Sequence, residues 1–277
     1  MFRALTLCVL ILVGAATART DQQAGSAGLP GSSGSSAQSG AYKMDVAALQ
    51  GGEGIVGLWV TIRDSSNAIV RDFEVIDEKP FHLFVVSRDL RFFRHLFPVV
   101  SPDGTLQASA AIPAGELLLV ADFMPSGGAR QFLRQVVTFG RTSRPDMRDQ
   151  ANAPATAGRG PSASPTGEFD VVTNVKIQPL PFTIPARERT ALHVMLSRTE
   201  DGRPLVNLEP YLGLGGYLLA VKEDLSEVVA AGAPTTGIPV SLLTFAMTFP
   251  TPGRYVVWVE FHRFGEPLAA RLELTAR

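Results

Sequence analysis

Three side chains in the first half of the chain have the types and the spacing of a small metal site. His82, Asp89 and His95 offer two imidazoles and a carboxylate, a ligand set suited to copper(II) or zinc. They would converge if the strand that begins near His82 and the loop that follows it fold back on each other. The sequence also leaves a second interpretation open, in which His82 is an ordinary strand residue and His95 a loop residue bonded to backbone or solvent.

Other reactive groups are few. The chain has a single cysteine, Cys8, and four histidines, which excludes thiolate zinc sites, iron–sulfur clusters, disulfide scaffolds and thiol nucleophiles from the mature chain. It also contains no Gly-x-Ser-x-Gly elbow, His-Glu-x-x-His pair or phosphate-binding loop. We therefore expect a protein that is not an enzyme. Lys+Arg total 25 and Asp+Glu total 26, so no basic field attracts nucleic acid, and we expect no such partner.

Residues 1–18 have the layout of a cleaved export signal. A basic residue near the start is followed by an apolar run from Leu5 to Val13 and by small residues that include Ala16 and Ala18. The apolar run is shorter than the roughly 20 residues that span a bilayer, and no other segment is long and apolar enough. We expect a periplasmic or secreted protein with no membrane span after signal cleavage.

Two segments have the composition of linkers. Residues 19–40 are rich in Gly and Ser, and residues 141–166 are rich in Pro, Ala and Arg. Such segments bury too little apolar surface to offset the entropy of ordering them, so we expect a disordered tether and a disordered linker. They leave two blocks, residues 41–140 and 167–277, which we predict to be separate domains.

Apolar residues alternate with other residues in both blocks, as in strands that bury one face. Examples are Val56, Leu58, Val60 and Ile62 in the first block and Leu192, Val194 and Leu196 in the second. Turn signals such as Asp103-Gly104 and Pro252-Gly253 separate the runs. The pattern predicts an all-β protein made of two antiparallel, immunoglobulin-like β-sandwich domains in tandem.

The two blocks also match each other. Residues 81–90 align without gaps with residues 216–225, and residues 115–123 align with residues 253–261. One ancestral sandwich present twice explains both matches. Asp89 and Asp224 occupy the same place in the two copies, which favours a structural role in capping a turn.

Aromatic residues divide between the two faces of the strand expected near residues 253–261. Tyr255 and Phe261 share one parity, and Trp258 has the other. One face must pack in the core. We expect the other to be a binding platform or a contact between the domains.

A wider signature in the first block consists of His82 at the start of an apolar strand, Asp89-Leu90, His95 and Pro98. It resembles the YtkA-like, immunoglobulin-like domains of bacterial exported proteins, which often occur near copper and other heavy-metal systems. In that family the loop commonly contains His-x-His-Pro, and this resemblance implies metal binding by the histidines. Here the second histidine of the pair is replaced by Phe97, and Tyr217 stands where the second block would have the strand histidine.

These observations predict an exported, non-catalytic binding protein. It would be linked to heavy-metal, in particular copper, handling through a weak site at His82, Asp89 and His95, with copper or zinc as the ion. The alternative is a structural or protein-interaction scaffold of the periplasm or cell exterior that has no ligand chemistry. The expected partners are accordingly a metal ion or another exported protein.

Overall fold

The structure is a computed structural model that describes residues 41–51, 54–140, 170–171, 175–180, 183–235 and 241–277. Within these ranges every regular element is a β-strand, and the strands form four sheets. The prediction of an all-β fold is therefore confirmed. The expected signal (1–18), tether (19–40) and linker (141–166) lie outside the described residues. Over the part of the chain that is described, no helix is long and apolar enough to cross a membrane.

The first unit contains strands β1 to β9. Their bounds are β1 Tyr42–Gln50, β2 Ile55–Asp64, β3 Phe73–Glu74, β4 Phe81–Ser87, β5 Phe93–Leu96, β6 Val99–Val100, β7 Leu106–Ala111, β8 Gly115–Pro125 and β9 Gln131–Phe139. One sheet has the order β1-β2-β7-β6. In the other, β8 lies between β4 and β9, β5 extends the sheet beyond β4, and β3 pairs with the end of β8.

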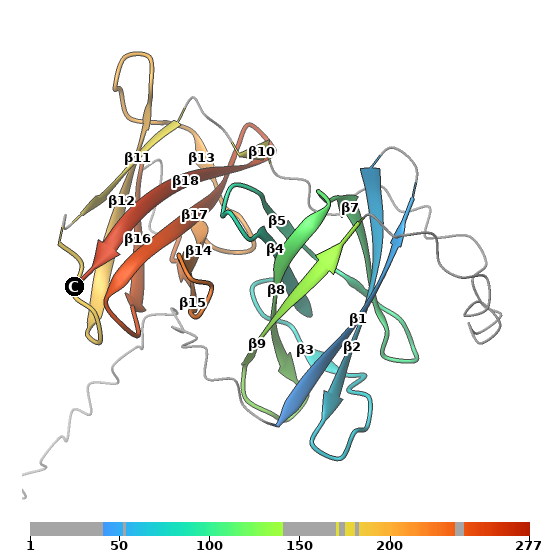
Figure 1. Cartoon of the computed structure of the whole chain (residues 1–277). Coiled ribbons are helices and arrows are strands. Elements are labelled where there is room, and N and C mark those ends of the chain that lie inside the picture. The colour runs from blue at the N-terminus through green and yellow to red at the C-terminus, as the bar shows by residue number, and fades with distance from the viewer. Residues whose placement is uncertain (1–40, 52–53, 141–169, 172–174, 181–182, 236–240) are drawn as a thin grey trace, which may run out of the picture.

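The second unit contains strands β10 to β18 (Figure 1). Their bounds are β10 Asp170–Val171, β11 Val175–Leu180, β12 Arg189–Arg198, β13 Leu208–Glu209, β14 Gly216–Lys222, β15 Val228–Ala233, β16 Leu242–Thr248, β17 Gly253–Arg263 and β18 Glu266–Ala276. One sheet has the order β11-β12-β16. The other has the order β10-β18-β17-β14-β15, with β13 paired to β17.

Both units have the strand order of an immunoglobulin-like fold. Strands β1, β2 and β7 correspond to A, B and E, and β9-β8-β4-β5 correspond to G-F-C-C′. The second unit repeats this order with β11-β12-β16 and β18-β17-β14-β15. Near the start of its F strand, the Tyr255 hydroxyl lies 2.8 Å from the Thr251 carbonyl oxygen, as in the tyrosine corner of such folds.

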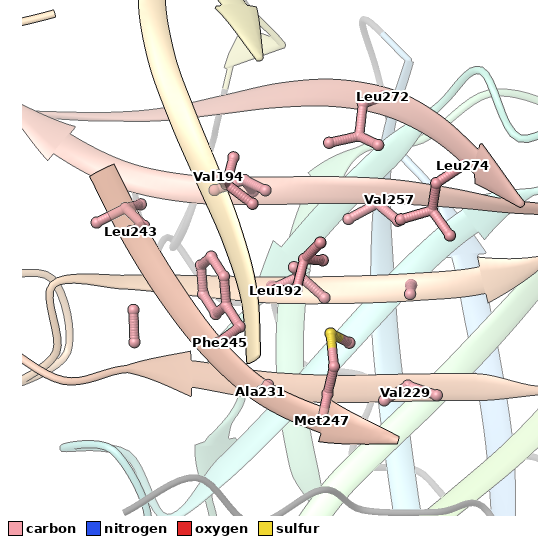
Figure 2. Packing of buried hydrophobic residues seen from close by; sticks show 14 of the residues in the cluster. Leu192, Val194, Val229, Ala231, Leu243, Phe245, Met247, Val257, Leu272 and Leu274 are labelled. Atoms are coloured by element: carbon pink, nitrogen blue, oxygen red, sulfur yellow. The ribbon is translucent and has the colours of Figure 1, made fainter. Parts of the chain in front are cut away.

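Each unit encloses a core between its own two sheets. In the first unit the alternating residues of β2 meet the inner face of β4 and β8. In the second unit, Leu192 and Val194 of β12 and Phe245 of β16 pack on Val257 and other inner residues of the facing sheet (Figure 2). The alternating pattern seen in the sequence is thus the mark of strands with one buried face.

Several strands do not alternate. Strands β4, β8, β14 and β17 are buried at nearly every position, so the outer faces of their sheets are covered as well. The covering layer is the other unit, because a third cluster of buried residues takes members from both. The two G-F-C-C′ sheets therefore pack face to face.

Candidate functional site

The contact between the two units contains the chemistry-bearing residues that the sequence singled out. Its apolar part is a continuous buried cluster. The first unit contributes Phe84, Val86, Leu90, Phe93, Leu118, Val120 and Phe132, and the second contributes Tyr211, Leu212, Leu214, Tyr217, Leu219, Val221, Leu225, Val228, Ala230, Val256, Trp258 and Ala269. Trp258 of β17 stacks on Phe93 of β5 with ring centroids 5.1 Å apart. The Trp258 face is therefore the domain contact, one of the two roles expected for it.

A string of hydrogen bonds crosses this apolar contact. His82 Nε2 lies 2.9 Å from the Ile76 carbonyl oxygen, His82 Nδ1 lies 2.9 Å from His95 Nε2, and His95 Nδ1 lies 2.8 Å from Glu260 Oε2. All three side chains are completely buried. The string joins β4 and β5 of the first unit to β17 of the second.

The Ile76 carbonyl oxygen at one end of the string determines which nitrogen and oxygen atoms carry the protons. A carbonyl oxygen only accepts, so His82 Nε2 must donate to Ile76. Neutral His82 then accepts at Nδ1 from His95 Nε2, which leaves His95 Nδ1 to accept from the Glu260 carboxyl group. Burial supports this neutral form, because it raises the pKa of Glu260 well above its ordinary value and lowers that of His95 well below. Burial, reinforced by His95, also lowers the pKa of His82 to about 4.

A second polar link lies beside the first. Arg130 donates from Nε to Asp122 Oδ1 at 2.7 Å and from Nη2 to Oδ2 at 2.5 Å. Tyr217 of the second unit donates its hydroxyl to the same carboxylate at 3.0 Å. Asp122 is fully buried and accepts three hydrogen bonds, so it is held as a carboxylate paired with Arg130. Tyr217 also stacks on His82, which joins the two links.

The contact has an approximate two-fold symmetry. Arg134 of β9 donates to the carbonyl of Leu225, 3.2 Å away, and Arg271 of β18 donates to the carbonyl of Leu90, 3.0 Å away. The strand registers make Arg134 equivalent to Arg271, and the sequence alignment makes Leu90 equivalent to Leu225. Each unit therefore reaches the same turn of the other with the same arginine, as in an isologous dimer.

The turns that receive these arginines contain the two aligned aspartates. Asp89 Oδ1 accepts from Ser87 Oγ and from the Arg91 amide, and Asp224 Oδ1 accepts from the amide and hydroxyl of Ser226. The following leucines have left-handed backbones, with φ of 57° at Leu90 and 62° at Leu225. The two aspartates therefore have the structural role expected of them. Each caps a turn, and that turn presents a backbone carbonyl oxygen to the other unit.

The three-ligand set expected from the sequence is not assembled. His82 and His95 do meet, but Asp89 lies in the turn beyond the opposite end of β4 and is exposed. Among the described residues, no group of three or more His, Cys, Asp and Glu side chains could hold a metal ion. The three side chains do not converge because the five strand residues 83–87 lie between His82 and Asp89, and the chain reverses only after that strand. His95 is also a strand residue rather than a loop residue.

Sequence analysis missed Glu260, Asp122, Arg130 and the two reciprocal arginines. A signal for the first two was present in the internal alignment. Asp122 aligns with Glu260, and His82 aligns with Tyr217. Polar residues at equivalent positions of otherwise apolar strands mark a shared polar position in the contact.

The second unit is similar to a known family. Residues 171–277, which include nearly all of the second unit, match a family described as "Domain of unknown function (DUF8832)". No curated protein matches the chain.

Solved structures with some likeness are bacterial adhesins. They are a 1.5-MDa bacterial ice-binding adhesin (8 % identity, TM-score 0.24), the Escherichia coli adhesin FdeC (12 %, 0.24) and the Yersinia pseudotuberculosis adhesin InvE (10 %, 0.22). The matches cover 85 %, 85 % and 84 % of this chain and 63 %, 64 % and 58 % of those chains, respectively. This chain thus spans less than two thirds of the length of each of them.

Proposed function

We propose that this protein is an exported, non-catalytic binding protein whose two immunoglobulin-like units act as one rigid body. The observation that carries this proposal is the contact itself. Its titratable groups His82, His95, Asp122 and Glu260 are completely buried and are bonded to one another or to Arg130 and Tyr217. A catalytic group must reach a substrate, and these side chains instead hold the two sheets together.

The finer alternatives have different support. The expected link to copper or zinc loses support, because Asp89 is remote and the two imidazoles are used by internal hydrogen bonds. The resemblance to YtkA-like domains supports an exported immunoglobulin-like module without supplying a metal site. A periplasmic or secreted location rests on the pattern of residues 1–18 and is tested by the N-terminal sequence of the protein recovered from each cell fraction.

Rigid docking is tested by backbone ¹⁵N relaxation on the full chain. The expected result is one rotational correlation time for amides of both units, because the cluster and the two polar links fix their orientation. Trp258→Asp places a charge opposite Phe93 and should separate the units into two faster-tumbling bodies. Two independent correlation times in the unmodified protein, or turnover of any substrate, would overturn the proposal.

A further inference from the structure

The last strands of the two units differ at their outer edges. In the first unit, β9 pairs with β8, and no other described strand pairs with it. In the second unit, β18 pairs with β17 on one side and carries additional chain on the other, at β10 and at Ile184. As far as the described residues go, a position that is filled in one copy of the fold is therefore open in the other.

The filled position has a defined hydrogen-bond pattern. Arg277 donates its amide to the Ile184 carbonyl at 2.9 Å, and the Ala186 amide donates to the Arg277 carbonyl at 2.8 Å. Ile184 forms a parallel bridge with Ala276 and places its side chain in the core, where it is 1 % exposed. An extended segment thus runs along the end of β18 and contributes one aliphatic side chain to the unit that it covers.

The equivalent position in the first unit is identified by strand register. Phe139 pairs with Gly115 as Ala276 pairs with Gly253, so Gly140 is equivalent to Arg277. The described part of the first unit has no such covering segment between its first two strands, and the strand bounds give the reason. The second unit has residues 181–188 between β11 and β12, whereas the first unit passes from β1 to β2 through residues 51–54, which is too short to cross to the other sheet.

A groove lies where that segment would be. It has a volume of about 630 Å³, and apolar side chains of Val46, Ala48, Val56, Val137 and Phe139 line it together with Gly140. Several of these, including Val46, Val137 and Phe139, are only partly buried although they pack against the core. The groove therefore combines an unpaired strand edge with an incompletely covered core, the two features that an added β-strand uses.

We propose that this groove binds an extended strand of another exported polypeptide, which runs parallel to β9, pairs with the Gly140 backbone and inserts one Ile-like side chain. The proposal rests on the non-catalytic binding function and names its partner class. The two linker-like segments of this chain, residues 19–40 and 141–166, offer few side chains of that kind. Residues 19–40 hold Leu29 as their one large aliphatic residue, next to Pro30, and residues 141–166 contain no Leu, Ile, Val or Phe.

The covering segment of the second unit supplies the probe. A fluorescein-labelled peptide with the sequence of residues 182–188, which contains Ile184 and Ala186, is titrated into the full chain and followed by anisotropy. The expected result is saturable binding that shifts the amide resonance of Gly140. A peptide with Ile184→Ser should bind at least tenfold more weakly, because burial of one aliphatic side chain contributes that much. N-methylation at the Ala186 amide, which removes a strand donor, should weaken binding as well.

Two protein variants on the same strand form a matched pair. Val137→Glu places a carboxylate in the groove and should abolish binding, whereas Val136→Glu lies on the opposite face, 48 % exposed, and should leave it unchanged. Ala48→Glu, at an exposed position of β1 that lines the groove, replaces the first variant if Val137→Glu does not fold.

Absence of saturable binding, or equal binding of the Ile and Ser peptides, would overturn the proposal. Binding that appears only after removal of residues 19–40 would overturn it too, because this chain's own segment would then occupy the groove. If both units have a single correlation time but the peptide does not bind, this inference is refuted and the proposed function stands. Two correlation times refute the proposed function.

Discussion

Two buried carboxyl groups at equivalent positions should respond in opposite directions to the same chemical change. Glu260 of β17 donates to His95 as a neutral acid, whereas Asp122 of β8 accepts from Arg130 and Tyr217 as an anion. Replacement of each carboxyl by its amide therefore tests the two assignments directly. We expect Glu260→Gln to stabilise the protein at pH 7 and Asp122→Asn to destabilise it.

The magnitude for Glu260 follows from proton linkage. Its pKa is raised on folding from an ordinary value of 4.5, so its contribution to stability is fully present below pH 4.5 and is lost as the pH rises. The folded group keeps its proton at pH values where the unfolded chain has released it, and each pH unit of that range costs about 1.4 kcal/mol. Glutamine avoids this loss and donates to His95 Nδ1 through its amide. Its second N–H lacks an acceptor, which costs about 1 kcal/mol, so the net gain is the linkage loss less that amount.

Urea denaturation between pH 4 and pH 8 measures this difference. The free energies of unfolding of the wild type and Glu260→Gln should agree within about 1 kcal/mol near pH 4.5 and diverge as the pH rises. Asp122→Asn should lose about 3 kcal/mol at pH 7, since it removes the closer of the two carboxylates that pair with Arg130 and leaves Asp77, 3.4 Å away. A Glu260→Gln protein that is less stable than the wild type at pH 7 would refute the neutral assignment and indicate a His95–Glu260 ion pair.

Three further outcomes follow from the same contact. Stability of the Glu260→Gln protein should fall as the pH drops below 6.5, because folding lowers the pKa of His82 to about 4 and that of His95 well below its ordinary value, so the stability that both contribute above pH 6.5 is lost as the pH falls. Urea titration of Glu260→Gln/His82→Phe, which should keep only the His95 part of this fall, checks the assignment. Phe93→Ala removes the ring that stacks on Trp258 and should cost about 3–5 kcal/mol by urea denaturation, so a loss below 1 kcal/mol would contradict a tightly packed contact. Calorimetric titration with copper(II) or zinc should give no stoichiometric binding that is lost in His82→Ala/His95→Ala, and uptake dependent on both histidines would restore the metal hypothesis.

Much of the fold was visible in the sequence because each strand with one buried face alternates. Val56 to Ile62 and Leu192 to Leu196 predicted their strands and inward faces correctly. The aligned Asp89 and Asp224 predicted a common turn, since an aspartate next to a left-handed residue caps its own backbone. These features depend on local geometry alone, which a short stretch of sequence specifies.

The site was harder to predict because it depends on which outer faces meet. Residues 83–86 and 117–121 are continuous apolar runs, and such runs indicate burial on both faces of a strand. They do not identify the covering layer, however. His95 and Glu260 are 165 residues apart, so nothing near either residue indicates that one imidazole and one carboxyl group share a proton. The metal hypothesis arose from the same limit, because it paired His95 with the nearest carboxylate in sequence.

The differences between the two copies show why the contact forms within one chain. Strand register makes His95 equivalent to Ala230, since these residues lie opposite Phe84 and Leu219. If the second unit paired with another copy of itself, Glu260 would face Ala230 and lose its hydrogen-bond partner in a buried position, at a cost of about 1–3 kcal/mol for each of two carboxyl groups. Pairing with the first unit supplies His95 and removes that cost. The two-fold arrangement of arginines and turns would permit either pairing, and the asymmetric His95–Glu260 bond selects the one between unlike units.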